Sequence, residues 1–170
     1  KHVELAAKEI EVCLYDEGDV KSSIVERECK KILMDKLPNY REYLDLQEYR
    51  DMIALLQKGV AIHHAGIMPV LREMIELLFD RGFIKLLFAT ETFAVGINMP
   101  TKTVIFSSVE KWDGNGRRLL YPHEYTQMAG RAGRRGLDKV GHVIHCCNLF
   151  EMPNSVDYKN MLCGPPQKLT

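Results

Sequence analysis

Residues 59–89 read GVAIHHAGIMPVLREMIELLFDRGFIKLLFA, and this stretch decides the fold. It opens with a short apolar run at residues 60–63, which is typical of a buried parallel strand. Apolar residues spaced by three and four follow Pro69, which suits the first turn of a helix, and Gly82 ends that helix. A second apolar run at residues 84–89 predicts another strand. A strand, a helix and a strand in this order predict a parallel sheet.

The same alternation extends in both directions from this stretch. Residues 103–106 and 141–146 are apolar runs that predict two further strands. Upstream, apolar residues at helical spacing predict helices at residues 2–14, 22–34 and 46–59, with an irregular connector between the second and the third. We therefore expect an α/β fold, in which helices cover both faces of a parallel sheet.

Local signals set the expected boundaries. Ser22 and Ser23 are candidate N-caps for the second helix, and Glu26 would complete a capping box. Near the carboxyl end the sequence reaches GPP, a combination of residues that predicts a linker. We expect one domain at residues 1–163 and a linker at residues 164–170.

Composition excludes several classes of protein. The 23 basic and 23 acidic residues cancel, so no global field draws the chain to nucleic acid. Basic residues gather after Pro100, however, which predicts a local face for a polyanion. The five cysteines show no C-x-x-C spacing, and we expect them to be reduced and no metal to be bound. No apolar run approaches membrane-spanning length, and no signal peptide is visible.

Ligands of parallel sheets bind outside the carboxyl ends of the strands. Three segments follow predicted strands or lie near them: HHAG at 63–66, ATETFAVGINMP at 89–100 and QMAGRAGRRG at 127–136. If the last segment is helical, its arginines share one face and repel each other by about 0.2–0.5 kcal/mol per pair. A bound polyanion would reverse that sign, because guanidinium groups match phosphate oxygens bidentately.

Together and in this order, the three segments resemble segments four-a, five and six of the second RecA-like domain of superfamily 2 helicases. The resemblance is closest to the superkiller-type DExH RNA helicases, which feed RNA to the exosome. It rests on TETFAVGINMP, on KWDG at 111–114, on EYTQMAGRAGRRGLD at 124–138 and on the closing GPPQKL. The family implies an ATP-dependent RNA helicase that unwinds or translocates 3′ to 5′ in RNA decay.

The resemblance also implies roles for single residues on the nucleotide side. Arg131 and Arg134 would reach the γ-phosphate of ATP, with Arg134 as the arginine finger. Gln127 would hydrogen-bond near the phosphates. Gly96 and Asn98 lie in segment five, where the family places a nucleotide-contacting polar group. Mg²⁺ would accompany ATP and would be bound mainly by the first RecA-like domain.

On the RNA side, the resemblance implies contacts to the phosphate backbone, which fix register without reading sequence. Thr90 would offer its hydroxyl and its backbone N–H. The backbone at Ala65 and Gly66 and the side chain of Arg72 would do likewise. Thr92 is a further candidate contact, although a helix N-cap near residue 93 is an equal alternative.

Other notable residues have ordinary explanations. Trp112 could stack on a base, but we expect it to pack against its own loop. Arg117 and Arg118 are expected to lie in a solvated loop. His63 and His64 are adjacent on a predicted strand, so their side chains should point to opposite faces and not share a metal.

The parent motor would need parts that residues 1–170 do not carry. Neither a P-loop, G-x-x-x-x-G-K-[ST], nor an acidic magnesium-binding segment occurs in them, and the chain does not begin with Met. We therefore expect a piece of a longer protein that is inactive alone and needs the first RecA-like domain of the same chain. The expected partners are single-stranded RNA, the RNA exosome and superkiller-type complex subunits, in the cytoplasm or in the nucleus.

Two other classes of function stay open at this stage. A nucleotide-independent RNA-binding or regulatory module would keep the RNA contacts without an arginine finger. A dinucleotide-binding domain is a weaker alternative, because the G-x-G-x-x-G turn is missing after the first strand. The residues also do not distinguish RNA from DNA as the bound nucleic acid, because phosphate contacts do not read the 2′-hydroxyl.

Overall fold

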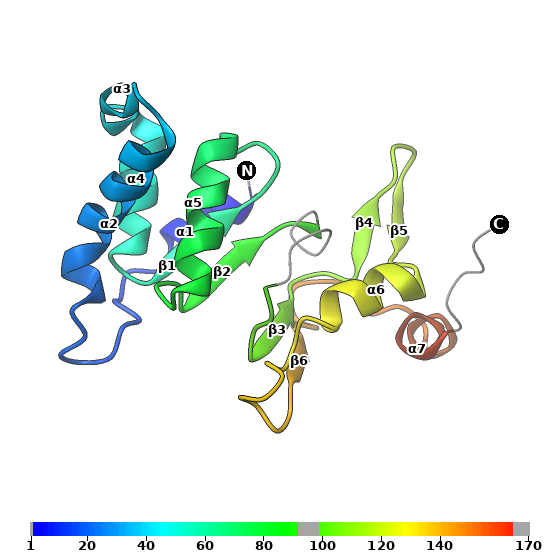
Figure 1. The fold of residues 1–170 in the computed structure, drawn as a ribbon. Coiled ribbons are helices and arrows are strands. Elements are labelled where there is room, and N and C mark those ends of the chain that lie inside the picture. The colour runs from blue at the N-terminus through cyan, green and yellow to red at the C-terminus, as the bar shows by residue number, and fades with distance from the viewer. Residues whose placement is uncertain (1, 92–98, 165–170) are drawn as a thin grey trace. The chain divides into compact units, whose positions relative to one another are not determined.

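The chain combines helices with two pairs of parallel strands and one antiparallel pair among its described residues (Figure 1). The computed structural model describes residues 2–91 and 99–164. The chain divides into two compact units, Lys1–Phe93 and Ala94–Thr170. The combination of helices and parallel strands confirms the α/β class predicted from sequence. Within the described ranges, no helix is both long and apolar enough to cross a bilayer.

The first unit contains four helices, a strand, a helix and a strand among its described residues: α1 (His2–Lys8), α2 (Lys21–Lys36), α3 (Tyr40–Leu44), α4 (Gln47–Leu56), β1 (Val60–His63), α5 (Pro69–Asp80) and β2 (Leu86–Ala89). The second unit contains β3 (Thr103–Phe106), β4 (Glu110–Trp112), β5 (Arg117–Leu119), α6 (Pro122–Ala129), β6 (His142–His145) and α7 (Ser155–Cys163).

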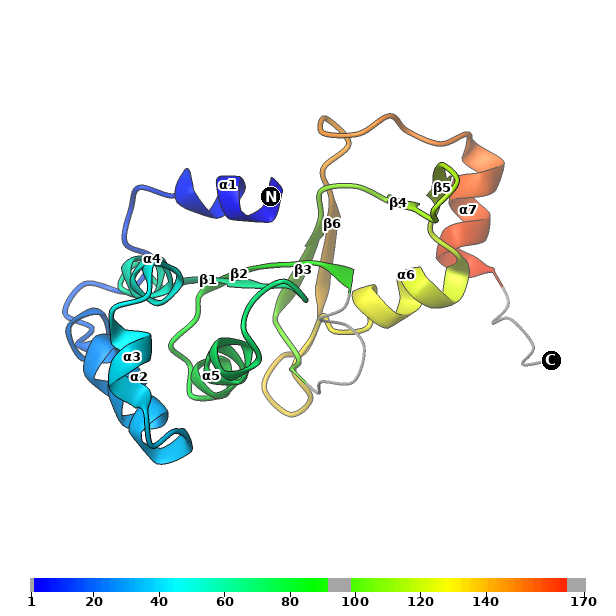
Figure 2. The same cartoon turned by 90° about the horizontal axis from the view of Figure 1, so that it is seen from above.

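Strands β1 and β2 pair in parallel and bury side chains on both faces. Val60 lies opposite Leu86 and His63 opposite Ala89. Because side chains alternate along a strand, Val60 packs on one side with α1, while Ala61 belongs to the core on the other side with α5. Figure 2 shows α1 and α5 on opposite sides of the two strands. Helices thus cover both faces of this sheet, as expected.

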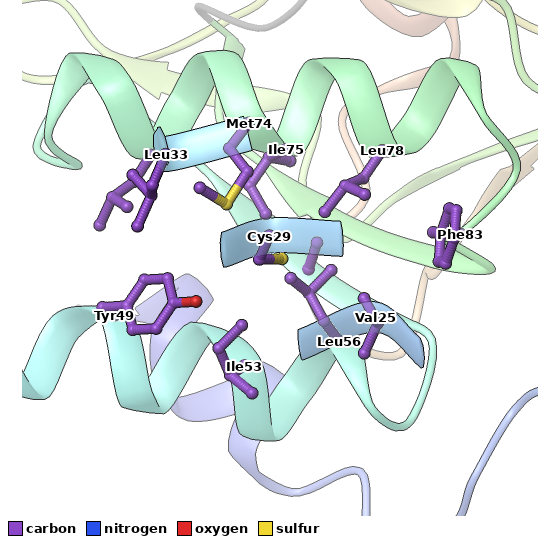
Figure 3. Packing of buried hydrophobic residues seen from close by; sticks show 12 residues of the cluster. Val25, Cys29, Leu33, Tyr49, Ile53, Leu56, Met74, Ile75, Leu78 and Phe83 are labelled. Atoms are coloured by element: carbon purple, nitrogen blue, oxygen red, sulfur yellow. The ribbon is translucent and has the colours of Figure 1, made fainter. Parts of the chain in front are cut away.

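The largest core is formed by α2, α4 and α5 (Figure 3). Helix α5 contributes side chains at intervals of three and four residues, which places them on one face. They are at most 1% exposed, and burial of each aliphatic side chain contributes roughly 1.5–3 kcal/mol. These side chains are Leu71, Met74, Ile75 and Leu78. This core holds α5 and therefore the loop that enters it from β1.

The second unit has its own sheet and its own core. Strands β3 and β6 pair in parallel, with Thr103 opposite His142 and Phe106 opposite His145. A separate cluster of buried residues joins this sheet to α6 and α7, and includes Tyr125 from α6 and Met161 from α7. The antiparallel hairpin β4–β5 and helix α6 stand next to each other in Figure 1.

The first helix is shorter than predicted, because tertiary contacts override its local pattern. It ends at Lys8, although the apolar spacing continues to residue 14. The backbone N–H of Leu14 donates to Lys58 O at 2.8 Å. The buried hydroxyl of Tyr15 lies 3.0 Å from Leu56 O and 2.5 Å from Phe83 O. These contacts draw the segment out of the helix and across the end of α4.

The predicted serine caps of α2 are wrong. The hydroxyl of Ser22 donates to Gln57 O at 2.6 Å, and that of Ser23 donates back to Val20 O at 2.7 Å. Asp19 lies just before the helix and accepts from the N–H of Lys21 at 2.9 Å. The N-cap residue is Val20, which makes no side-chain cap bond, and Asp19 before it accepts the N–H of the first helical residue.

Three elements were not predicted: α3 in the expected connector, the β4–β5 hairpin and α7. The hairpin turns at residues 113–116, D-G-N-G, a sequence typical of tight turns. Helix α7 begins after Asn154, whose side chain accepts the N–H of Asp157 at 2.9 Å. Both signals are readable in the sequence.

Candidate functional site

The carboxyl ends of β1 and β2 bring two of the predicted segments together. His63 and Ala89 are register partners, and the N–H of Thr90 donates to His63 O at 3.2 Å. Ala65, Gly66 and Thr90 are exposed at this edge. The rule that directs attention to strand ends thus finds HHAG beside the segment that begins at residue 89. The N–H of Thr90, expected to face a phosphate, is used for this internal bond.

The two histidines are held apart by separate carboxylates. His63 is 3% exposed, and its Nε2 lies 2.9 Å from Glu76 Oε1. The Nε2 of His64 lies 3.1 Å from Glu4 Oε1, and its Nδ1 accepts the N–H of Gly66 at 3.1 Å. His64 therefore shapes the exposed turn. In residues 2–91 and 99–164, no group of three His, Cys, Asp or Glu could hold a metal ion.

The structure describes one of the remaining predicted RNA contacts and not the other. Arg72 lies in the first turn of α5, half-buried, and its backbone N–H donates to Met68 O within that turn. Thr92 lies outside the described residues, as do Gly96 and Asn98, which were predicted on the nucleotide side. Of the predicted RNA-side residues, the structure thus describes Ala65, Gly66, Arg72 and Thr90, all in the first unit.

The arginine segment is a loop that hydrogen-bonds to the chain after segment five. Helix α6 ends at Ala129, so only the start of QMAGRAGRRG is helical. The N–H of Thr101 donates to Arg131 O at 2.8 Å, and the N–H of Gly133 donates to Thr101 O at 2.7 Å. Thr101 and Ala132 form a parallel bridge. The backbone of the loop is therefore fixed, and its arginines do not share a helical face.

Two glycines allow this path. Gly133 has a φ of +88°, a conformation that side chains other than glycine rarely adopt. A Cβ on Gly141 would lie 2.5 Å from the carbonyl carbon and oxygen of Ala132. The start of β6 therefore passes directly against the loop, and only glycine permits the approach.

Arg134 is bound by Asp138, a residue that the sequence reading did not assign. The Oδ2 atom of Asp138 accepts the backbone N–H of Arg134 at 2.9 Å and its Nε at 2.8 Å, while Oδ1 accepts Nη2 at 2.9 Å. These hydrogen bonds from Arg134 hold the pKa of the Asp138 carboxyl well below its usual range. The i,i+4 spacing of opposite charges was the available sequence signal.

The nucleotide-side residues that the structure describes lie in the second unit, on α6 and the loop. Gln127 and Arg134 are exposed, while Arg131 is half-buried. Helix α6 therefore presents an amide, and the loop presents guanidinium groups from a fixed backbone. Such donors match the oxygens of a phosphate chain.

The hairpin is attached to the first turn of α6 through one carboxylate. Glu124 accepts two bonds from the guanidinium of Arg118 at 2.8 and 2.9 Å, one from Lys111 Nζ at 2.9 Å and one from the N–H of Tyr121 at 2.8 Å. These bonds, those of Arg118 first, lower the pKa of Glu124 to about 2. The expectation of a solvated Arg118 is therefore wrong.

Trp112 also departs from its expectation. Its side chain is 67% exposed, so it does not pack into its own loop. Its register partner on β5 is Arg117, which is exposed as expected. An antiparallel hairpin places the two residues opposite each other at its outer end.

An aromatic cluster also holds α6. His145 ends β6, and its Nε2 lies 3.0 Å from the hydroxyl of Tyr125 on α6, while its Nδ1 contacts the hydroxyl of Tyr158 on α7. Burial lowers the pKa of His145, so the neutral ring is favoured. Helix α6, which carries Gln127, is thus held by the hairpin and by this cluster.

These features belong to a known class of domain. The model of the helicase conserved C-terminal domain matches residues 26–136, more than half of the chain, and the chain belongs to this family, with the RecA-like fold and in its superkiller-type branch. The matched range contains HHAG, segment five and the arginine loop. The resemblance seen in the sequence is therefore confirmed.

Three relatives illustrate the similarity. The antiviral helicase SKI2 of Saccharomyces cerevisiae is 53% identical over 130 residues, 76% of this chain and 10% of that protein. Superkiller complex protein 2 of Homo sapiens is 52% identical over 124 residues, 73% of this chain and 10% of that protein. The ATP-dependent RNA helicase mtr4 of Schizosaccharomyces pombe is 53% identical over 125 residues, 74% and 11% of the two chains. The chain spans about a tenth of each relative.

Proposed function

We propose that this chain is the second motor domain of an ATP-dependent RNA helicase, which supplies an arginine finger and contacts to the RNA backbone. The carrying observation is the fixed loop at residues 131–138, which presents exposed Arg134 from a backbone bonded to Thr101. Membership in the helicase family supports the same conclusion. The names of the relatives agree, since one is called an ATP-dependent RNA helicase.

The donors of this loop fit the phosphates of ATP. Bound ATP would supply the phosphoryl group whose transfer to water drives the motor. Arg134 would donate to the γ-phosphate and neutralise charge that develops during transfer, an effect of about 10³–10⁵ in rate in other nucleotide hydrolases. Arg131 would add positive charge from the same loop, and Gln127 would donate an amide hydrogen from α6. We assign Mg²⁺ to the first RecA-like domain.

On the RNA side, Thr90 and the turn at Ala65 and Gly66 would contact backbone phosphates. Their exposure at adjacent strand ends supports this assignment. Arg72 would contribute charge from the start of α5. Such contacts release counterions, so RNA affinity would fall with salt. They fix the position of the strand without reading its bases.

The parent protein would couple these two sets of contacts. Closure of a first RecA-like domain on this one would bring Arg134 to the nucleotide, and alternate grip on RNA would move the strand 3′ to 5′. We extend the proposal to RNA decay with the RNA exosome and with superkiller-type complex subunits in the cytoplasm. The name of one relative, Superkiller complex protein 2, supports the complex. Alone, residues 1–170 would not hydrolyse ATP.

The test compares two neighbouring arginines in the full-length protein. Arg134→Ala should abolish RNA-stimulated ATP hydrolysis and leave RNA affinity within a few-fold. Arg135→Ala is the matched control, because it removes an equal, exposed charge from the same loop, and its turnover should stay close to wild type.

Two results would contradict the proposal. Full turnover by Arg134→Ala would show that Arg134 is not the arginine finger. RNA binding that ignores ATP analogues, together with a lack of ATP hydrolysis in the wild-type protein, would instead indicate a nucleotide-independent RNA-binding or regulatory module.

A further inference from the structure

The segment from Arg134 to Asp138 closes on itself through backbone and side-chain bonds. The N–H groups of Leu137 and Asp138 donate to Arg134 O at 3.0 and 2.9 Å. In return, the carboxylate of Asp138 accepts from the backbone N–H of Arg134 and from two nitrogens of its guanidinium. Gly136, with a φ of +81°, makes the turn between them. The loop thus fixes both the backbone and the side chain of Arg134.

The geometry of this pair leaves one edge of the guanidinium uncovered by Asp138. A guanidinium has five N–H groups, and the carboxylate takes the one on Nε and one of the two on Nη2. The terminal edge, made by Nη1 and the other N–H of Nη2, is the second fork that can bind an oxyanion bidentately. The carboxylate and a phosphate can therefore bind the same arginine at different edges.

The environment of Asp138 suits a residue that holds its partner. The Asp138 side chain is 9% exposed, whereas that of Arg134 is 44% exposed. The carboxylate is therefore the shielded member of the pair, and the arginine is the member that reaches solvent. A long arginine side chain loses rotamer freedom when it binds, and a prior bond reduces that loss.

We propose that Asp138 is a positioning residue, which holds Arg134 side-on so that its terminal edge is aimed at the nucleotide phosphates. This inference rests on the proposed role of Arg134 as arginine finger. The opposite role is a latch, in which Asp138 competes with the phosphate for Arg134. The two roles predict opposite effects when the carboxylate is removed.

The experiment measures ATP hydrolysis by the full-length protein with saturating single-stranded RNA. Asp138→Asn and Asp138→Ala should lower kcat about 10- to 100-fold, because misplacement of a catalytic group by about 1 Å costs on the order of 10²-fold. KM for ATP and RNA affinity should stay within a few-fold. The asparagine variant keeps one acceptor oxygen, so it should lose less than the alanine variant.

Asp113→Asn is the matched control. Asp113 lies in the same unit, accepts backbone N–H groups from Asn115 and Gly116, and lies 3.9 Å from Arg118 Nε. Asp113 thus resembles Asp138, because it is an aspartate that accepts N–H groups of a turn and lies near an arginine. That arginine is Arg118 and not Arg134. Its substitution should leave kcat close to wild type, and the melting temperatures of all variants are compared to exclude unfolding.

The double variant Asp138→Ala/Arg134→Ala, together with the single variants, distinguishes a failure of the role of Asp138 from a failure of the role of Arg134. If Asp138 acts through Arg134, the double variant should be no slower than Arg134→Ala, because the two effects are not additive. A normal kcat in both Asp138 variants, with Arg134→Ala inactive, would overturn the role of Asp138 and keep the finger. A raised kcat or a lowered KM would establish a latch and overturn positioning. Full activity of Arg134→Ala would overturn the proposed function itself.

Discussion

Glu124 accepts two hydrogen bonds from the guanidinium of Arg118, at 2.8 and 2.9 Å, and so joins hairpin β4–β5 to the first turn of α6. The same carboxylate accepts from Lys111 Nζ on β4 and from the N–H of Tyr121. A single side chain therefore connects both strands of the hairpin to the helix. Since Gln127 lies one turn further along α6, this connection also fixes the helix that carries a proposed nucleotide contact.

Glu124→Gln should loosen the hairpin. The substitution removes the charge that binds Arg118 and Lys111, and we expect the local free energy of opening to fall by about 1 kcal/mol. Hydrogen-exchange mass spectrometry of peptides that cover β4 and β5 should show faster exchange. Glu110→Gln is the control, because Glu110 is an exposed glutamate on the same hairpin. Equal exchange in the two variants would contradict this account.

The same carboxylate predicts a loss of stability in acid. Its pKa lies at about 2 in the folded chain, below the ordinary value of 4.5. The stabilisation is complete above the unfolded pKa of about 4.5 and is lost as the pH falls through about 2, because the unfolded state binds the proton first. Denaturant unfolding at several pH values should show a shallower acid decline in Glu124→Gln than in wild type. Parallel declines would show that other carboxylates dominate.

Gly141→Ala should displace the arginine loop. The added Cβ would lie 2.5 Å from backbone atoms of Ala132, so either β6 or the loop must move. We expect a loss of about 1–3 kcal/mol in the free energy of unfolding, as for other overpacked sites, and slower ATP hydrolysis in the full-length protein. Gly116→Ala is the control, because its Cβ would meet nothing within 4 Å. Wild-type stability and turnover in Gly141→Ala would refute the close approach.

Trp112 offers a direct optical test, because it is the only tryptophan in the 170 residues. With 67% of its side chain exposed, its fluorescence should have the long-wavelength emission of a solvated indole. Acrylamide should quench it in the folded 170-residue chain nearly as well as in urea. A short-wavelength emission that is protected from acrylamide would mean that the indole is buried.

Much of the fold could be predicted because its signals are local. The strand β1, helix α5 and strand β2 follow from apolar spacing, a proline and a glycine within residues 59–89. The end of α1 could not be predicted, because Tyr15 binds carbonyls that lie 41 and 68 residues further along the chain. Local pattern contains no information on such contacts.

The candidate site likewise has parts that local sequence signals predict and parts that they do not. The strand-end rule directed attention to residues 63–66 and to the segment that begins at residue 89, and in the structure the N–H of Thr90 donates to His63 O. The bridge between Thr101 and Ala132 depends on backbone atoms, which leave no mark in side-chain identity. Asp138 was missed for another reason. Its charge is visible four residues after Arg134, but the turn alone brings its carboxylate oxygens to the backbone and guanidinium nitrogens of Arg134.

The way the loop is held bears on protein engineering and on the comparison of relatives. Thr101 binds the loop through its backbone alone, so its side chain could vary, whereas position 141 must stay glycine to let the chain pass. Residues 127–138 and Gly141 thus form one unit in space, although residues 139 and 140 separate them in the sequence. A chimaera that grafts this loop from another helicase would need to keep glycine at position 141, three residues beyond the loop.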